Sequence, residues 1–520
     1  MRAPARHPKP ALPPARVPAA WSAAVGAVFG ALYLVLAPPV TGPKDCSEFT
    51  LVLAFGGAAH PTGYPLFVIL GRVFVTALHA LGATWAYAAN AWSAVGGGVA
   101  MGLYHALAAR LVPPGARPGR FGRFALALVP AALFGINPVW TLDAILVEVY
   151  TWHLAWVCGT CLFAVATVRA FAARGSPWDA RRLAATAVGW GLLCGLGMAH
   201  HATAALVILA LTVTLAIAGA RAGVTRPWVL ALAVGAALVP LTSYAFVAWR
   251  AFHPALFQWP TLEPSWRSVV VHLLGESYRD LLGHFAPTAV QAALLRAWAY
   301  PVLFPALLAL IVAVARARGT ERTILGGVLA AAALQTLYAF NYGVLDPSSY
   351  FQPAMAAGLL AIPAFGARIA ASRRAAPIAA LIAGVIVAVL GAQELRVTDG
   401  TRIGTLIVDR RARALWASLP RGPCVVFWRH DLAMKLRTYQ LLEGSRPDVY
   451  VQNPDALTWR LPRREFEQRF GFDPLGGLAP LTAAKVATIP ANVNRQTRLP
   501  VVVFDLEGST LHLLEKVGSP

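Results

Sequence analysis

Charged residues are scarce in this chain of 520 residues. Only 13% of the residues are Asp, Glu, Lys or Arg, whereas 58% are hydrophobic, and the mean hydropathy is +0.59. A soluble globular protein has about 25% charged residues. The composition therefore excludes an ordinary soluble domain and indicates a polytopic membrane protein.

Cysteine is also scarce, and the five cysteines are scattered along the chain. Their spacing excludes a disulfide framework and a zinc knuckle. Cys158 and Cys161 lie within one apolar run, where core packing is the simplest interpretation.

Acidic residues are the rarer charges: 23 Asp and Glu stand against 44 Lys and Arg, which gives a net charge of +21. Such a charge could indicate a nucleic-acid partner. Here, however, the basic residues gather in short linkers between apolar runs and in the C-terminal quarter. We therefore expect no nucleic-acid partner.

Eleven apolar runs are long enough to span a bilayer, which takes about 20 residues. They cover residues 19–37, 86–109, 123–141, 150–171, 183–199, 202–220, 228–248, 290–314, 323–340, 352–369 and 375–394.

The linkers between these runs alternate in charge. One set holds 20 Lys and Arg and two acids; the other holds five Lys and Arg and eight acids. Basic loops face the cytoplasm, so the first set, with the N-terminus, is expected inside and the second outside. Residues 63–81 are also apolar, but counting them as a span would place the basic loops outside. We therefore expect a short interfacial helix there.

Residues 396–520 contain no spanning run. Strands are expected near 424–428, 448–452 and 501–505, with a helix over 431–442. This order predicts a small α/β domain with a partly parallel sheet. The predicted divisions are a disordered basic N-terminus (1–17), a transmembrane domain (18–395) and an extracytoplasmic α/β domain (396–520).

The first outward linker carries the strongest chemical signal. It contains Asp45-Cys46-Ser47-Glu48-Phe49, followed by His60-Pro61-Thr62-Gly63-Tyr64-Pro65. Two carboxylates three residues apart share a helix face, where one can act as a general base while the other binds or orients a substrate or a cation. The alternative is an N-cap with an acid in the first helical turn.

Every other outward linker also carries polar residues that a simple connection does not need. Arg250 is a candidate phosphate clamp, whereas Trp259 could instead anchor at the headgroups. The full set of candidates in these linkers is Glu148, Tyr150, His200, His201, Arg250, Trp259, Asp346 and Tyr350.

These motifs resemble the D-S-G-E-F and H-P-P-G-Y-P signature of a membrane family related to protein O-mannosyltransferases, within the GT-C glycosyltransferase superfamily. The resemblance covers roughly residues 20–355. It continues through Glu148-Val149-Tyr150, His200-His201, the segment from Trp249-Arg250 to Trp259, and the segment from Asn341 to Phe351. Cys46 and Ser47 stand where the family has Ser-Gly, and Thr62 stands in place of a proline.

The resemblance implies a GT-C-type bundle of about 11 transmembrane helices, with interfacial helices in the first outer loop. It also implies a polyprenyl-phosphate sugar donor, an acceptor hydroxyl on a protein or glycan, and inversion at the sugar. Asp45 would be the general base and Glu48 its catalytic partner, with His60, Tyr64 and the candidates of the other linkers binding substrate. A divalent cation (Mg or Mn) is a candidate cofactor, with no metal ligands assigned.

Two other classes of function stay open at this point. A transporter or flippase of lipid-linked sugar predicts charges at mid-membrane and inverted repeats, and a membrane scaffold predicts only a binding role for the outer domain. The Ala-, Arg- and Pro-rich composition suggests a bacterial inner membrane, and mannose is one candidate sugar.

Overall fold

The computed structural model describes residues 17–113, 119–173, 178–344, 346–370, 372, 375–428, 431–476, 486–504 and 510–515. The predicted disordered N-terminus therefore lies, except for Val17, outside the described residues.

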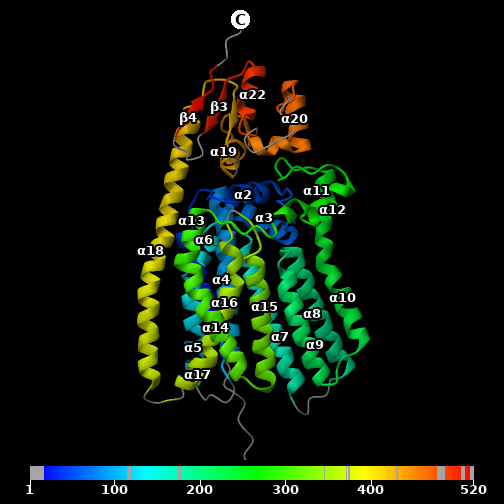
Figure 1. Cartoon of the computed structure of the whole chain (residues 1–520), viewed down its shortest axis with the longest axis vertical. Helices are drawn as coiled ribbons and strands as arrows, with labels where there is room; N and C mark the ends of the chain where they lie inside the picture. The colour runs from blue at the N-terminus through cyan, green and yellow to red at the C-terminus, as the bar shows by residue number, and fades with distance from the viewer. Residues whose placement is uncertain are drawn as a thin grey trace, which may run out of the picture.

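A bundle of long helices makes up most of the molecule (Figure 1). Its first half contains α1 (Ala19–Leu36), α4 (Trp85–Leu111), α5 (Arg120–Gly135), α6 (Pro138–Ile145), α7 (Tyr150–Ala172), α8 (Ala180–His200) and α9 (Ala204–Arg221). Its second half contains α10 (Pro227–Leu241), α11 (Ala245–Phe252), α13 (Ala289–Leu294), α14 (Tyr300–Arg316), α15 (Gly319–Ala339), α16 (Ser348–Leu359), α17 (Ala361–Ala370) and α18 (Ala375–Ala417).

Eight helices of the described chain are long and apolar enough to cross a membrane, or nine if the bent pair α5 and α6 forms one span. All eleven predicted spans correspond to helices of this bundle. The two that fall outside the nine are α4 and α15, with 27 and 21 residues. Helix α4 is central and carries buried polar residues such as Asn90, Ser93 and His105, which explains its lower hydropathy.

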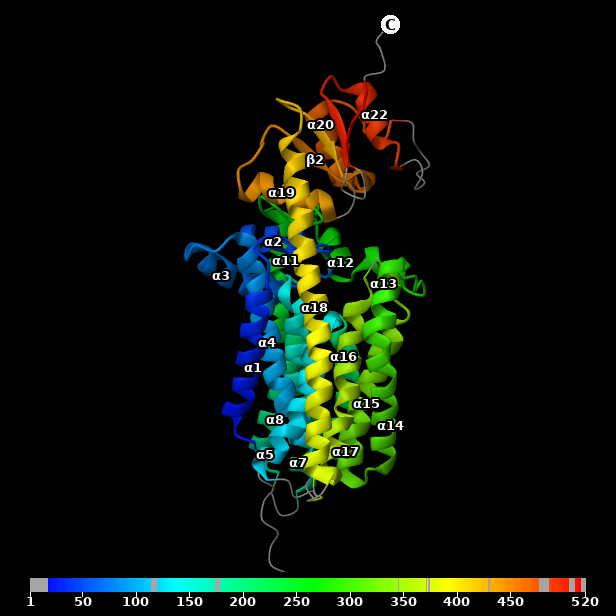
Figure 2. The ribbon, with the colours of Figure 1, turned by 90° about the vertical axis from the view of Figure 1, so that its left-hand side faces the viewer.

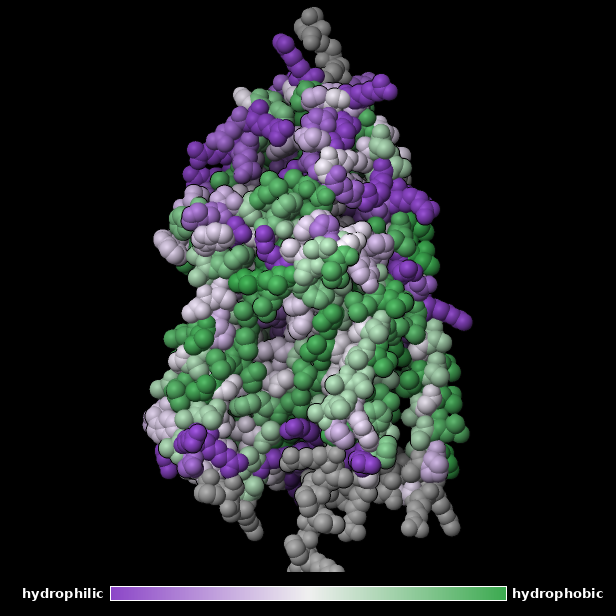
Figure 3. Space-filling model, turned by 180° about the vertical axis from the view of Figure 1, so that it is seen from behind, coloured by the Kyte–Doolittle hydropathy of each residue, from purple (hydrophilic) through white to green (hydrophobic). Residues whose placement is uncertain are grey.

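The surface agrees with a membrane location. Figure 3 shows hydrophobic residues over the sides of the bundle and hydrophilic residues gathered at its two ends. A bilayer solvates such an apolar belt and leaves the polar ends in water. The protein is therefore an integral membrane protein.

The loop after α1 forms two short apolar helices, α2 (Cys46–Phe55) and α3 (Pro65–Ala80), at the upper end of the bundle in Figure 1. Helix α3 lies across this end and protrudes from it (Figure 2). The predicted interfacial helix over 63–81 is thus confirmed as a separate, short element. Helix α12 (Trp266–Leu273) and the short helix η2 (Glu276–Leu281) lie in the long linker between α11 and α13.

The C-terminal part contains a four-stranded sheet in the order β2-β1-β3-β4. Strand β1 (Val425–Phe427) pairs in parallel with β2 (Tyr450–Gln452) and β3 (Val501–Phe504), and β3 pairs antiparallel with β4 (Leu511–Leu513). Around it lie α19 (Asp431–Leu442), η4 (Pro454–Thr458), α20 (Arg460–Phe470) and α22 (Ile489–Gln496). The predicted partly parallel sheet is confirmed; β4 was missed.

Helix α18 connects the two parts. It has 43 residues and runs along the bundle to the sheet (Figure 2). The predicted division between residues 395 and 396 falls inside this helix, and the division into domains stays a prediction. Because α18 ends at the upper end, the sheet lies on the same side of the bundle as α2 and α3 (Figure 1).

Candidate active site

Asp45 is the N-cap residue of α2. Its backbone carbonyl accepts the hydrogen bond from the Phe49 amide at 2.8 Å, but its side chain makes no capping hydrogen bond. The carboxylate of an N-cap Asp normally accepts a hydrogen bond from a backbone amide of the first turn. Here the carboxylate is 52% exposed and points outward, so it is available to a ligand.

Glu48 lies one turn further along and is buried. Its Oε1 accepts hydrogen bonds from the backbone amide of His60 at 2.8 Å and from His60 Nδ1 at 2.9 Å. The other ring nitrogen of His60, Nε2, lies 3.8 Å from Asp45 Oδ2. The imidazole therefore sits between the two carboxylates, and the three side chains form one cluster.

The cluster holds His60 in its charged form. Burial alone lowers the pKa of the imidazole, but Glu48 and Asp45 outweigh it and raise the pKa to about 9. Burial raises the pKa of Glu48, while His60 opposes this shift. At neutral pH the geometry therefore favours an imidazolium bound to Glu48, beside the exposed Asp45.

Tyr64 links this cluster to a cavity. The turn before α3 places Gly63 at φ +85° and Tyr64 at φ +41°, the left-handed region that a glycine adopts freely. In this conformation the Tyr64 hydroxyl lies 3.2 Å from His60 Nε2, and its ring stacks on His201 with 5.6 Å between centroids.

The cavity has a volume of about 300 Å³. Its walls come from distant segments: the turn before α3, the turn between α8 and α9, η2, and the facing parts of α15 and α16. Five tyrosines line it, Tyr64, Tyr278, Tyr338, Tyr342 and Tyr350, together with His201 and Arg279. The Tyr278 ring lies 6.3 Å from the His60 ring, so the cavity and the acidic cluster adjoin.

The two adjacent histidines have different surroundings. His200 Nε2 lies 3.0 Å from the Val149 carbonyl oxygen, which fixes this ring inside the bundle. His201 Nδ1 lies 2.7 Å from Thr203 Oγ1, and its Nε2 has no hydrogen-bond partner among the described residues. Burial lowers the pKa of His201 to about 3, so a neutral imidazole faces the cavity.

Tyr150 and Tyr350 were predicted in separate linkers, and the structure brings them together. Their rings lie 5.5 Å apart, and the Tyr150 ring lies 5.6 Å from that of His201. Tyr350 lines the cavity, and Tyr150 contacts Tyr350 without lining the cavity itself.

A second charged cluster lies next to the first, around Lys44. The Lys44 amine lies 3.0 Å from Asp143 Oδ1 and also contacts Asp346. Ser349 and Gln352 donate hydrogen bonds to the other oxygen of Asp143 at 2.5 and 2.7 Å. Glu148 is buried near this lysine; burial raises its pKa, and Lys44 opposes the shift. Both oxygens of Asp143 are thus occupied.

The structure separates two predicted residues from the acidic cluster. The Arg250 guanidinium lies 4.1 Å from the Trp249 ring centroid and donates to the His253 carbonyl oxygen. Trp259 packs on Trp459 of the C-terminal part, with centroids 5.2 Å apart. Neither lines the tyrosine cavity.

Several residues of the site were not among the predicted ones. Lys44 and Asp143 were missed because an isolated charged residue in a linker looks like the ordinary linker charge that orients a protein in the membrane. Tyr278 and Arg279 belong to the long linker after α12, and nothing in their local sequence marks them as neighbours of His60.

Asp45, Glu48 and His60 could also hold a metal ion, since one ligand atom of each lies within 4.8 Å of the others. The donor set, two carboxylates and an imidazole, suits a divalent cation. However, His60 Nδ1 and Nε2 already contact Glu48 and Tyr64. An ion would therefore have to displace one of these contacts.

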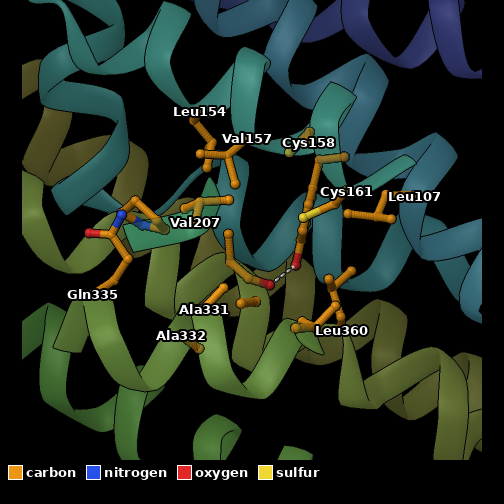
Figure 4. A pocket seen from close by; sticks show the side chains of 15 residues that line it. Leu107, Leu154, Val157, Cys158, Cys161, Val207, Ala331, Ala332, Gln335 and Leu360 are labelled. Carbon is orange, nitrogen blue, oxygen red and sulfur yellow. Dashed lines mark hydrogen bonds between the residues drawn. The ribbon is translucent and has the colours of Figure 1, made fainter. Parts of the chain in front are cut away.

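A smaller apolar cavity lies deeper in the bundle and is separate from this site (Figure 4). Cys158 and Cys161 line it with Leu107, Val207 and Leu360, and Tyr104 donates a hydrogen bond to the Ala356 carbonyl oxygen at 2.6 Å. Both cysteines are buried in the hydrophobic core, as expected for packing residues.

Comparisons with known proteins agree with the predicted class. Residues 45–222 match the family model of the protein O-mannosyl-transferase TMEM260 N-terminal domain. This match begins at Asp45 and includes Glu48, His60, Tyr64 and the two histidines after α8. No curated protein sequence matches the chain.

Solved structures share the fold. ArnT from Cupriavidus metallidurans bound to undecaprenyl phosphate matches with a TM-score of 0.52 and 16% identity, over 84% of this chain and 90% of that chain. The Archaeoglobus fulgidus oligosaccharyltransferase in the apo form matches with a TM-score of 0.50 and 12% identity, over 93% and 69%. The chain has a GT-C-type fold. The family match and the fold both agree with the predicted enzyme class, a membrane glycosyltransferase.

Proposed function

We propose that this protein transfers a sugar from a polyprenyl-phosphate donor to an acceptor hydroxyl, with inversion at the anomeric carbon. The observation that carries the proposal is the half-exposed Asp45 carboxylate beside the Glu48–His60 pair, at the edge of a tyrosine-lined cavity. Tyrosine faces and hydroxyls suit a neutral sugar, which offers both apolar ring faces and hydroxyl groups.

Asp45 is the general base of this reaction. Its carboxylate takes the proton of the acceptor hydroxyl as that oxygen attacks the anomeric carbon, and the bond to the lipid phosphate breaks. Glu48 holds His60 in place, and the resulting imidazolium faces Asp45.

Negative charge grows on the departing phosphate. The cations beside the cavity are His60 and Arg279, and they stabilise this charge. Arg250 remains a candidate for the same phosphate when the lipid approaches from the side of α11. The bound lipid of ArnT, undecaprenyl phosphate, supports a polyprenyl carrier here.

The same carboxylates are the candidates for holding a divalent cation, Mg or Mn. Such an ion supplies positive charge for the leaving phosphate. The residues would then be Asp45 and Glu48, with His60 displaced from its position between them.

We also propose that transfer takes place on the extracytoplasmic face of a bacterial inner membrane. In support, the acidic cluster and the C-terminal part share one end of the bundle (Figure 1), while the basic linkers 221–226 and 316–322 join helices at the other end. Basic loops stay in the cytoplasm, so the proposed orientation has the N-terminus inside and the C-terminal domain outside. Mannose is the first donor sugar to test, and the acceptor is a protein or a glycan.

The test is sugar transfer by the purified, reconstituted protein. Radiolabelled polyprenyl-phosphate mannose and related donors are supplied with peptide and glycan acceptors, and wild type is compared with Asp45→Asn and Glu48→Gln. Asp399→Asn is the matched control, since this exposed carboxylate lies on α18 and pairs with Arg402. Transfer by wild type and the control, but not by Asp45→Asn, supports the proposal; equal transfer by all overturns the role of Asp45.

The same protein, reconstituted in lipid vesicles, distinguishes a transferase from a flippase and from a scaffold. A flippase moves labelled lipid-linked sugar between leaflets without forming product, and a scaffold does neither. The acids at one end of the bundle, rather than at mid-membrane, favour transfer over transport.

A further inference from the structure

A buried lysine of the C-terminal part contacts the loop that leads to Asp45. Lys435 of α19 is 3% exposed, and its Nζ donates to the Thr41 carbonyl oxygen at 2.7 Å and to Thr41 Oγ1 at 3.3 Å. It also pairs with Asp409 of α18 at 2.9 Å. An ammonium has three donors, and these three contacts use them all.

The loop from α1 to α2 has no regular structure, so its backbone carbonyls depend on side chains. Four consecutive carbonyls, those of residues 38–41, are held in this way. Helix α4 and its N-cap hold three of them and the C-terminal part holds the last: Asn90 bonds Pro38 and Val40, Thr84 bonds Pro39, and Lys435 bonds Thr41. The carbonyl held by Lys435 is the one nearest to Asp45 in the chain.

Ser47 completes the connection from the other side. It is buried, lies between Asp45 and Glu48 in the chain, and donates from Oγ to Thr41 Oγ1 at 3.0 Å. Lys435 and Ser47 therefore meet on the same hydroxyl. A glycine at position 47, as in the family signature, lacks this bond.

Packing joins the same elements. Helix α19 lies directly above α2 in Figures 1 and 2 and contacts it. Met434 of α19 belongs to the hydrophobic core of the bundle, whereas its neighbours Ala433 and Leu436 belong to a core of the C-terminal part. The helix is thus shared by both parts, and Lys435 lies at their junction.

We propose that Lys435 is a positioning residue of the transfer reaction, through which the C-terminal domain holds the segment 41–48 and so orients Asp45 and Glu48. This inference rests on the proposed function. It assigns the C-terminal domain a part in catalysis that involves no contact with the sugar.

The test uses the full-length protein with Lys435→Met, Lys435→Arg and the control Arg463→Met. Arg463 belongs to the same domain but pairs with Glu467 and Asp473, away from α2. Asp409 keeps Arg413 and Tyr439 as partners in the Lys435 variants, so no buried carboxylate is left alone. A misplaced catalytic group costs up to about 100-fold in rate.

We expect Lys435→Met to lower kcat by about 10- to 100-fold while KM for the donor stays within twofold. Lys435→Arg restores part of the rate, and Arg463→Met behaves as wild type. Wild-type kcat in Lys435→Met overturns the proposal. Should Lys435→Met fold poorly, Lys435→Gln lowers kcat in its place, because a shorter, neutral amide replaces the ammonium that bonds the Thr41 carbonyl and Asp409, and wild-type kcat in Lys435→Gln overturns the proposal.

Hydrogen–deuterium exchange provides a readout that does not need turnover. Lys435→Met is expected to speed exchange of amides in the 41–48 segment, whereas Arg463→Met leaves it unchanged. Unchanged exchange in Lys435→Met overturns the positioning role. If wild type transfers no sugar from any donor, the proposed function fails, and this measurement still decides whether Lys435 holds the loop.

Discussion

Two charged clusters lie side by side at the upper end of the bundle, and they differ in how fully their groups are paired. Around Lys44, both oxygens of Asp143 are occupied, by Lys44 on one side and by Ser349 and Gln352 on the other. Around His60, Glu48 is occupied but Asp45 remains half-exposed, 3.8 Å from the imidazole.

This difference in pairing points to a structural role for the Lys44 cluster and a chemical role for the His60 cluster. Removing a buried carboxylate whose two oxygens are both bonded, such as Asp143, leaves its partners uncompensated and destabilises the fold. A carboxylate with a free face adds little to stability but can take a proton from a ligand. We therefore assign the Lys44 cluster to holding the loops together and the His60 cluster to the reaction.

The sharpest test of this division is Asp45→Asn. Loss of a general base lowers the rate by about 10²- to 10⁴-fold, whereas the melting temperature is expected to stay within about 2 °C because the side chain makes no capping bond. Transfer assays and thermal unfolding in the same detergent measure both. Asp399→Asn is the control, and a large drop in melting temperature with unchanged transfer would reverse the assignment.

Asp143→Ala is expected to show the opposite pattern. It leaves Ser349 without its acceptor, Gln352 with only the Val139 carbonyl oxygen and Lys44 with only Asp346, so the free energy of unfolding falls by about 3–5 kcal/mol. Thermal or denaturant unfolding measures this loss, with Asp399→Ala as the control. A stable variant that fails only in transfer would place Asp143 in the reaction instead.

The Glu48–His60 pair predicts a pH dependence. The pKa of His60 is raised from 6.5 to about 9. Its contribution to stability is therefore complete below about pH 6.5 and is lost as the pH rises through about 9. We expect the melting temperature of wild type to fall more between neutral pH and pH 10 than that of His60→Gln. Parallel decreases in the two proteins would contradict a charged His60.

The smallest effect is expected at the cavity wall. Tyr278→Phe removes one hydroxyl from the lining and keeps the ring beside His60. One hydrogen bond is worth about 0.5–1.5 kcal/mol, so KM for the donor is expected to rise about two- to tenfold with kcat unchanged. A decrease in kcat alone would instead connect Tyr278 to the Glu48–His60 pair.

Much of the fold could be predicted because it depends on patterns along the chain. Runs of apolar residues predict the helices of the bundle, and the distribution of arginine separates α3 from the spans. The strands of the sheet follow from short β-branched runs such as Val501–Phe504. Strand β4 could not be predicted, because three residues at the edge of a sheet carry no pattern of their own.

The site was predicted only in part. The motif at Asp45, Glu48 and His60 is local, so its residues were found together, and His201 and Tyr350 line the adjoining cavity. Arg250 and Trp259 do not, because Arg250 lies on α11 against Trp249, whereas Trp259 packs on Trp459 of the C-terminal part. Lys44, Tyr278 and Lys435 were missed, since each acts through a contact with a distant segment.

The sequence by itself determined that this protein resides in a membrane, that α3 is a short element apart from the spans, and that two carboxylates precede a histidine turn. These features rest on hydropathy, charge and local turn chemistry. Only the tertiary structure decided which carboxylate is free. Glu48 is buried and hydrogen-bonded to His60, whereas Asp45, at the N-cap of α2, stays half-exposed. The contacts through Thr41 brought Lys435 of the C-terminal part to the loop that precedes Asp45, because side-chain partners depend on packing rather than on proximity in the chain.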